Sequence, residues 1–416
     1  MRAGTYCALV IAVMALLPQD LAARAKEKIL YGFRGGTDGG FPSSSLIVDA
    51  AGNLYGTTLY GGDLSQCSND GCGTVFQLTP SSNGTWRETV LHAFQGGSDG
   101  IYPGGNLLFD SAGNLYGTTA QGGNGTTCSA SGCGTVFQLS PHRDGSWTET
   151  IVHSFQGPPD GAGPIGLTFD RSGTLYGTTV SGGQHDGIAY SLSPPEQEGE
   201  SWREKILYDG VSSNPPLLID EQGNLYGTYY DLFTQSCYDS RHCGAVFVLE
   251  PEPEQWLEAD LYEFLGGGNG GEPAAGVIRD GEGNLYGTAA EGGNNYGIVF
   301  ELTTSGGKWK KKMIYNFCSR NNCADGAYPL AALVMDKNGS LYGTTSWGGL
   351  CLSGCGVVFK LARTGGGWKE TVLHNFAGSA PDGQNPQQSL IFDAKGNLYG
   401  VANSSQYAGI VFEITP

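Results

Sequence analysis

One short motif recurs along the whole chain. The tetrapeptide Asn-Leu-Tyr-Gly, or a near variant of it, starts at Asn53, Asn114, Thr174, Asn224, Asn284, Ser340 and Asn397. Successive copies lie between 50 residues (174 to 224) and 61 residues (53 to 114) apart. A repeat of several tens of residues indicates a propeller, a solenoid or an array of small units, and it excludes most other folds.

Each of the seven repeat units predicts four short β-strands. In the first unit these cover residues 46–49, 54–58, 73–78 and 86–92. The first strand is continuously apolar, which predicts an innermost strand buried on both faces. The fourth mixes Trp, Arg and Glu, as expected of an outer edge strand whose charges discourage pairing with other chains. Three positions before the Asp that ends the first strand, the units carry Leu46, Leu107, Leu167, Leu217, Val277, Leu333 and Leu390.

The two ends of the chain predict how the repeat closes. Residues 28–33 match the fourth strand of a unit, and residues 410–414 match the third. The last unit therefore lacks a fourth strand, and the first residues supply one. An open solenoid would need caps, whereas a ring closed by the two ends needs none. We predict an all-β, seven-bladed β-propeller of four-stranded antiparallel blades over residues 26–416, with the N-terminal strand paired to the C-terminal blade.

The N-terminus predicts export. Arg2 precedes an apolar run from Leu9 to Leu17, and Ala23-Arg24-Ala25 follows, which is the pattern of a signal peptide covering residues 1–25. The run is too short for a membrane-spanning helix. We therefore expect a secreted, extracellular protein without membrane insertion, and a monomer.

Ten cysteines beyond residue 25 form five close pairs. An even number of cysteines in an exported chain favours disulfides. Zinc would require two pairs brought together or nearby histidines, and the usual C-x2-C spacing is absent. The pairs are Cys67/Cys72, Cys128/Cys133, Cys237/Cys243, Cys318/Cys323 and Cys351/Cys355.

The net charge limits the classes of partner. A formal charge of −18 argues against nucleic acid, which requires a basic surface, and against anionic membranes. Extracellular glycans and proteins remain as candidate partners.

The repeat resembles a known family. Residues 49–58 read Asp-x-x-Gly-Asn-Leu-Tyr-Gly-Thr-Thr, residues 73–78 read Gly-Thr-Val-Phe-x-Leu, and residues 86–94 read Trp-x-Glu-Thr-Val-Leu-His-x-Phe. Seven such copies resemble the GloVer tandem repeat of exported bacterial proteins, the choice-of-anchor tandem repeat GloVer-containing proteins, and the first segment is similar to NHL-type propellers. Members often carry a C-terminal anchoring segment; this chain ends inside its last unit, so a freely secreted form is expected. The resemblance implies no activity and no site residue.

A recurring Gly-x-Asp-Gly-x-x-Pro loop between fourth and first strands supplies the first candidate site. If these loops surround one mouth of the channel, their carboxylates could bind a cation such as calcium, or sugar hydroxyls. The sequence favours the alternative, a turn-capping Asp before Gly, and indicates no cofactor. The residues are Asp38, Asp99, Asp160, Asp325 and Asp382, with Asn269 in the corresponding place of another unit.

The fourth unit breaks the pattern and supplies the second candidate site. It loses Gly-x-Asp-Gly at residues 211–216, and its second-to-third loop becomes rich in aromatic residues. Departures from a local rule are expected at functional sites, and clustered aromatics suit sugar stacking or a protein hot spot. The alternative is a degenerate unit whose aromatics fill a gap. The candidate ligand-binding residues are Tyr229, Tyr230, Asp231, Phe233 and Tyr238.

Other recurring polar residues have structural interpretations. We expect the Asp of each Asp-x-x-Gly-Asn turn to accept hydrogen bonds from its own turn. The Gly after each repeat Tyr is expected to allow close approach by a neighbouring blade. His92, His153 and His374 occupy a position that holds Tyr in the other units, which indicates packing between strands.

Three hypotheses for function follow. The sequence favours a secreted binding or scaffold propeller that recognises extracellular glycan or protein through its loops. It contains no Gly-x-Ser-x-Gly, His-Glu-x-x-His or phosphate-loop motif. The alternatives are an extracellular polysaccharide lyase or hydrolase with acidic residues near the channel mouth, and a structural envelope component without catalytic activity. Two acids and a base converging in one cavity would support the enzymatic alternative.

Overall fold

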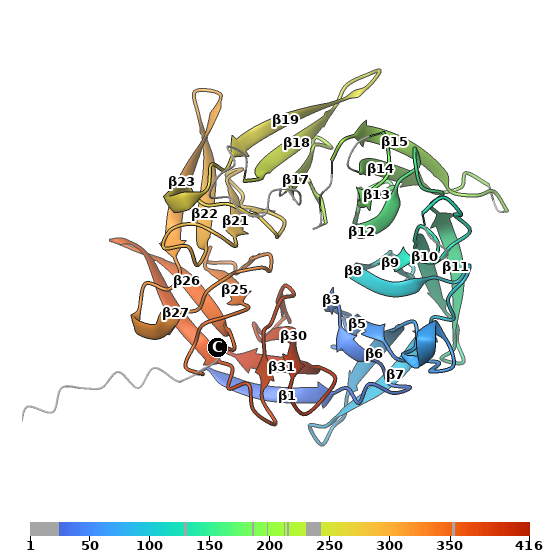
Figure 1. The fold of residues 1–416 in the computed structure, drawn as a ribbon, viewed down its shortest axis with the longest axis horizontal. Helices are drawn as coiled ribbons and strands as arrows, with labels where there is room; N and C mark the ends of the chain where they lie inside the picture. Colours follow the sequence, from blue (N-terminus) through green and yellow to red (C-terminus); the bar gives the residue numbers. More distant parts are fainter. Residues whose placement is uncertain are drawn as a thin grey trace, which may run out of the picture.

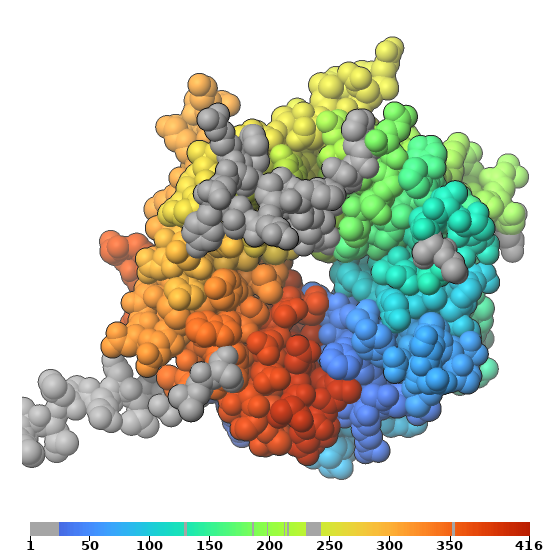
Figure 2. Space-filling model, in the orientation of Figure 1, coloured from blue at the N-terminus to red at the C-terminus, as the bar shows by residue number. Residues whose placement is uncertain are grey.

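A computed structural model of the chain contains seven β-sheets arranged in a ring (Figure 1). It describes residues 25–128, 131–184, 187–197, 199–211, 213, 216–229, 243–351 and 354–416. The predicted seven-bladed β-propeller is confirmed. Figure 2 shows the opening at the centre of the ring.

We number the blades by the order of their second strands along the chain. Blade 1 consists of β2 (Gly40–Pro42), β4 (Ile47–Val48), β5 (Leu54–Tyr60), β6 (Thr74–Pro80) and β7 (Trp86–Ala93). Blade 2 consists of β8 (Ile101–Phe109), β9 (Leu115–Gln121), β10 (Thr135–Pro141) and β11 (Trp147–Ser154), with β3 (Ser44–Ser45) paired parallel to β8. Blade 3 consists of β12 (Ala162–Phe169), β13 (Leu175–Ser181), β14 (Ile188–Ser193) and β15 (Arg203–Asp209).

The remaining blades repeat this order from the inner to the outer strand. Blade 4 consists of β16 (Leu218–Ile219), β17 (Leu225–Tyr229), β18 (Ala245–Pro251) and β19 (Trp256–Glu263). Blade 5 consists of β20 (Ile278–Arg279), β21 (Leu285–Ala289), β22 (Ile298–Ser305) and β23 (Lys308–Asn316). Blade 6 consists of β24 (Val334–Met335), β25 (Leu341–Thr345), β26 (Val357–Thr364) and β27 (Gly367–Asn375). Blade 7 consists of β28 (Gly383–Gln384), β29 (Ile391–Phe392), β30 (Leu398–Ser404), β31 (Ile410–Thr415) and β1 (Lys26–Gly32).

Helical structure in the described residues is limited to three short 3-10 turns, none long and apolar enough to cross a membrane. They are η1 (Cys67–Asn69), η2 (Gly267–Asn269) and η3 (Asn321–Cys323).

The ring closes through the two ends of the chain. Strand β1 pairs antiparallel with β31, from Lys26 opposite Thr415 to Gly32 opposite Ile410. Figure 1 shows β1 as the outermost strand beside β31. The closure predicted from the terminal residues is confirmed.

The first strands are less buried than their apolar sequence predicts. The aliphatic residue three positions before each turn Asp is at most 5% exposed in all seven blades. The next two residues, such as Ile47 and Val48, are only half-buried. One face of the inner strand is therefore in the core, and the other borders the channel side.

The turn after each first strand is held by its Asp, as expected. Asp49 Oδ1 accepts the N–H groups of Ala51 and Asn53 (2.9 and 2.8 Å), and Oδ2 accepts the Asn53 amide and the Tyr55 hydroxyl (2.7 and 3.0 Å). Burial opposes ionisation of Asp49, but these hydrogen bonds outweigh it and hold the pKa below its ordinary value. The Tyr-to-Asp bond recurs in every blade at 3.0–3.3 Å.

The Gly after each repeat Tyr serves its own blade, which corrects the sequence interpretation. Gly117 lies opposite Phe137 on the neighbouring strand. A Cβ on Gly117 would lie 2.5 Å from Cζ of Phe137 and 2.8 Å from Leu107. The missing side chain therefore makes room for an aromatic ring within the blade, not for the next blade.

Aromatic contacts join adjacent blades. At six interfaces a buried Phe at the end of one outer strand packs on the aromatic of the third strand in the next blade, with ring centroids 5.0–5.2 Å apart. Edge-to-face geometry of this kind is favourable beyond the area that it buries.

Four of the predicted disulfides are confirmed: Cys67–Cys72, Cys128–Cys133, Cys318–Cys323 and Cys351–Cys355. Of the fifth pair, Cys243 is buried and Cys237 lies outside the described residues.

We expect Gly117→Ala to lower the free energy of unfolding by about 1–3 kcal/mol, because the new methyl group overpacks against Phe137. Gly104→Ala in the same blade is the control, since a Cβ there meets no atom within 4 Å. Chemical unfolding of both variants checks this. Equal stability of the two would contradict the packing role of the repeat Gly.

Candidate functional site

Two sets of loops share one face of the ring. The N–H of Gly62, in a second-to-third loop, donates to the carbonyl of Gly36, in a fourth-to-first loop (3.1 Å). Gly123 and Gly97 repeat this bond in the next blade (2.8 Å). We call the surface formed by these two loop sets the loop face.

One cavity at the centre of the ring is bordered by neutral side chains among the described residues. All seven blades contribute to a cavity of about 240 Å³. Its lining includes Ser43, Asn106, Pro216, Ala275 and Gln388, and among the described residues that border it none is acidic. The carboxylates expected near the channel by the enzymatic hypothesis do not line this cavity.

The five predicted aspartates instead contact the outermost strands. Asp38 accepts a hydrogen bond from the Tyr31 hydroxyl on β1 (3.0 Å) and one from the Arg34 N–H (3.0 Å). Asp325 is bound in the same way by Tyr315 (2.8 Å) and Ser319. Asp99, Asp160 and Asp382 lie 3.0, 3.5 and 3.2 Å from the Nε2 atoms of His92, His153 and His374. Each Asp thus holds its own loop to the preceding outer strand.

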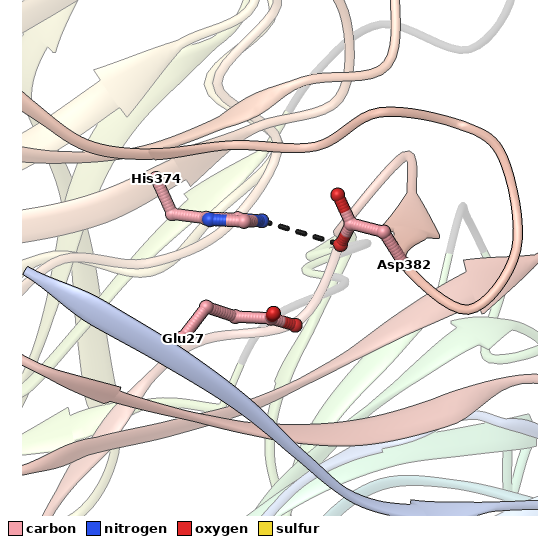
Figure 3. A group of neighbouring side chains, drawn as sticks. All are labelled: Glu27, His374 and Asp382. Carbon is pink, nitrogen blue, oxygen red and sulfur yellow. Dashed lines mark hydrogen bonds and ion pairs between the residues drawn. The ribbon is translucent and has the colours of Figure 1, made fainter.

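A Glu from the next blade completes each of three groups. Glu149 of β11 lies 3.8 Å from the His92 Nε2, and Glu204 of β15 lies at the same distance from the His153 Nε2. Figure 3 shows the third group, in which Glu27 comes from β1 while His374 and Asp382 belong to blade 6 and the loop that follows it. We call such a group an interblade clasp. The histidines therefore join neighbouring blades, which extends their predicted packing role.

The side chains of the three clasps are of types that bind metal ions. At other blade interfaces, however, different residues stand at the same positions. One His and two carboxylates within 4.8 Å of one another are acceptable ligands for zinc. Two interfaces have Tyr in place of His: Tyr31–Asp38–Glu88 and Tyr315–Asp325–Glu370.

At the interface between blades 4 and 5, both the Asp and the Glu of the clasp are replaced. Asn269 stands in place of Asp and accepts a hydrogen bond from Tyr262 (2.7 Å), and Lys311 stands in place of Glu and donates to the Asn269 carbonyl. Because Tyr, Asn and Lys can close the same contact, we interpret the clasps as hydrogen-bonded links between blades.

The clasps bring two acids and a base together, which the enzymatic hypothesis requires. They lie between packed outer strands, however, and the same arrangement recurs around the ring. Positions that recur at several interfaces and accept different residue types indicate a structural role and not a single active site.

The clasps place a carboxylic acid beside a carboxylate. Burial, and then the adjacent Asp99, raise the pKa of Glu149, while hydrogen bonds keep the pKa of Asp99 low despite burial. Burial and Asp38 raise the pKa of Glu88 to about 7, and burial raises that of Glu370 to about 7. Near neutral pH Glu149 and Glu88 therefore retain protons that exposed Glu would lose, whereas the Arg320 guanidinium, which donates a hydrogen bond to Glu370, opposes protonation there.

Tyr229 is half-buried and packs against the core cluster shared by blades 3 and 4. Where the other interfaces carry the buried Phe, the interface of blades 3 and 4 has Gly210, and the Tyr229 ring packs 6.0 Å from the Phe247 ring. Its hydroxyl donates to Asp260 on β19 (3.0 Å). This fits the gap-filling alternative for Tyr229. The candidates Tyr230, Asp231, Phe233 and Tyr238 lie outside the described residues.

A backbone feature of the loop face was missed by sequence reasoning. The residue before the loop Pro has positive φ in six blades, an unfavourable conformation for any residue except Gly. Each N–H there binds a carbonyl of the preceding blade, as Tyr102 does with Cys72 (2.9 Å). The residues are Phe41, Tyr102, Gly163, Glu272, Tyr328 and Asn385, with φ between 49° and 66°.

Further aromatics surround this position in blade 6. Tyr328 lies beside Trp347, which follows β25. Tyr296, from the second-to-third loop of blade 5, stacks on Trp347 with centroids 6.2 Å apart and planes 11° apart. Trp347 is 36% exposed and Leu350 is 74% exposed. A hollow of about 540 Å³ is lined by Tyr296, Asn321, Asn322, Trp347 and Leu350, among others. We call Tyr296, Tyr328 and Trp347 the blade 6 platform.

Blade 1 carries a second aromatic group at the same two repeat positions. Phe41 is 52% exposed and contacts Tyr60 edge to face (5.6 Å). Tyr102, from β8 of blade 2, also contacts Tyr60 edge to face (5.5 Å). We call Phe41, Tyr60 and Tyr102 the blade 1 platform. The signal available in the sequence was an aromatic residue directly before Pro in the Gly-x-Asp-Gly-x-x-Pro loop.

Comparison with known proteins identifies the repeat. The Gloeobacter/Verrucomicrobia repeat matches residues 20–142, 125–321 and 233–416. No curated protein matches the chain.

Several solved structures match the chain at low identity. A putative 6-phosphogluconolactonase from Bacteroides uniformis is 14% identical over 79% of this chain and 84% of its own, with a TM-score of 0.49. PorZ from Porphyromonas gingivalis is 14% identical over 89% of this chain and 46% of its own (TM-score 0.49). A family AA12 enzyme of Trichoderma reesei is 12% identical over 95% of this chain and 96% of its own, with a TM-score of 0.45. Likeness at this level assigns no activity to the chain.

We expect the protein to lose stability as the pH rises. The clasp Glu residues have folded pKa values above their unfolded values. Their contribution to stability is therefore complete below about pH 4.5 and is lost as the pH rises through the folded values, about 7 for Glu88 and Glu370 and about 9 for Glu149. Glu149→Gln, which keeps a neutral partner for Asp99, should reduce this loss by about 1 kcal/mol, the scale of one pKa unit. Thermal unfolding at pH 5, 7 and 9 measures it.

Glu254→Gln is the control for this experiment, because the Glu254 side chain is exposed. Its pH profile should follow the parent protein. If Glu149→Gln follows the parent as well, the clasp does not hold the proton that we assign to it.

Proposed function

We propose that this chain, which belongs to the Gloeobacter/Verrucomicrobia repeat family, is an exported binding propeller that recognises a neutral extracellular glycan on its loop face. One observation carries the proposal: the exposed Trp347 lies beside Tyr296 and Tyr328 at the edge of a hollow that also contains the Asn321 and Asn322 side chains. The C–H faces of sugars pack on aromatic rings, and their hydroxyls pair with amides.

The hollow is held in place before any ligand binds. Cys323 and Cys351 line it, and each belongs to a local disulfide. The N–H of Tyr328 is bound to the Tyr296 carbonyl (2.8 Å), which ties together the loops that carry two of the platform rings. A site ordered in advance loses less entropy on binding than a mobile loop does.

The charge of the chain favours a neutral ligand. At a formal net charge of −18, the protein repels uronic-acid and sulfated polysaccharides at long range. The signal-peptide pattern and the disulfides support export, where such glycans are found.

The test is binding of the oxidised protein to an array of neutral and acidic polysaccharides. We expect selective binding to neutral ones, weakened about tenfold or more by Trp347→Ala, since removing one stacking aromatic costs about 1–3 kcal/mol in related ring-stacking sites. Trp347→Phe should retain most of the affinity because it keeps a ring.

Leu257→Ala is the matched control, because Leu257 is an exposed apolar residue on the outer strand β19. It should bind like the parent protein. Absence of neutral-glycan binding by the parent, or equal binding by the parent and Trp347→Ala, would refute the proposal.

A further inference from the structure

The two platforms lie on either side of one blade. Blades 6, 7 and 1 follow one another around the ring (Figure 1). Tyr328 and Trp347 of blade 6 occupy the same two repeat positions as Phe41 and Tyr60 of blade 1. Among the blades whose residues at both positions are described, these two alone carry an aromatic at each.

Blade 7 fills the same two positions with polar, uncharged residues. Asn385 stands before its loop Pro with φ 49°, and Ser404 ends its second strand. Beside them Gln384 pairs with Asn403 across β28 and β30. All four are partly exposed, so blade 7 presents amides and a hydroxyl between two aromatic platforms.

Hydrogen bonds join the three blades into one surface. Asn385 donates its backbone N–H to the Cys355 carbonyl and its side-chain amide to the Ser346 carbonyl of blade 6 (2.7 Å each). The N–H of Phe41 binds the Ala408 carbonyl of blade 7. The aromatic and polar groups therefore have fixed relative positions.

The surface of aromatic and uncharged polar groups on blades 6, 7 and 1 does not continue at these two repeat positions in blade 5. Blade 5 has Glu272 and Glu291 at the same two positions, and burial together with Glu291 raises the pKa of Glu272. An acidic pair there disfavours continuation of the same surface.

From this order of aromatic, amide and aromatic groups we infer that the ligand is an extended, neutral glycan chain that spans blades 6, 7 and 1. Sugar rings stack on the blade 6 platform and on Phe41 and Tyr60, and the hydroxyls between them pair with Asn385 and its polar neighbours. This inference rests on the proposed function and adds the length and direction of the ligand. A folded protein partner would not require alternating ring and amide contacts along a line.

The experiment is calorimetric binding of neutral oligosaccharides of increasing length, from disaccharides to decasaccharides of the cello-, laminari- and malto-series. Phe41→Gly is the informative variant, because it removes the ring while glycine accepts the positive φ, as Gly163 does in blade 3. Its thermal midpoint should therefore match that of the parent.

We expect affinity to rise with length beyond the shortest oligosaccharides. Phe41→Gly should weaken binding of the long chains about tenfold and leave short-chain binding within twofold, whereas Trp347→Ala should weaken both. Leu257→Ala again serves as the control.

Two outcomes would overturn the inference in distinguishable ways. If affinity is constant with length and Phe41→Gly has no effect, the site is confined to blade 6, and the proposed function stands. If no oligosaccharide binds and an extracellular protein binds the loop face instead, the proposed function fails together with the extended site.

Discussion

The pairing of β1 with β31 is the contact on which the ring depends. Without it, the last blade would expose the edge of β31, and the first residues would form an unpaired strand. The contact joins residues almost 390 positions apart (26 to 415), so every other blade must already be in its place around the circle. Closure removes the two edges that an open array of sheets would present to other chains.

Adjacent blades are held by an inner and an outer contact. The inner contact is an aromatic pair in the core, and the outer contact is an interblade clasp between edge strands. Both contacts vary between interfaces: between blades 3 and 4 Gly210 stands in place of the Phe, and Tyr229 packs near Phe247 within blade 4. Between blades 4 and 5 Lys311 accompanies Asn269. Different side chains can therefore stand at equivalent places of the ring.

Much of the fold followed from the repeat, while the chemistry of the surface did not. Strand order, four disulfides and the turn aspartates could be predicted because each depends on local pattern, and ring closure could be predicted because the two chain ends match complementary strands of the repeat. The place of Asp38 and its equivalents could not, since a loop that runs from the outer to the inner strand can hold a carboxylate at either end. The platforms were missed because Phe41 and Tyr60 meet only when the short strand β2 pairs with β5 in the folded blade.

The positive-φ residue before each loop Pro has an evolutionary consequence. Its backbone is anchored to the preceding blade whatever side chain it carries, as Gly163, Glu272, Asn385 and three aromatics show. A substitution at this position therefore changes the side chain on the loop face without changing the backbone that holds it. Related chains could acquire different ligands by exchanging these few residues while every strand and every blade contact is inherited intact.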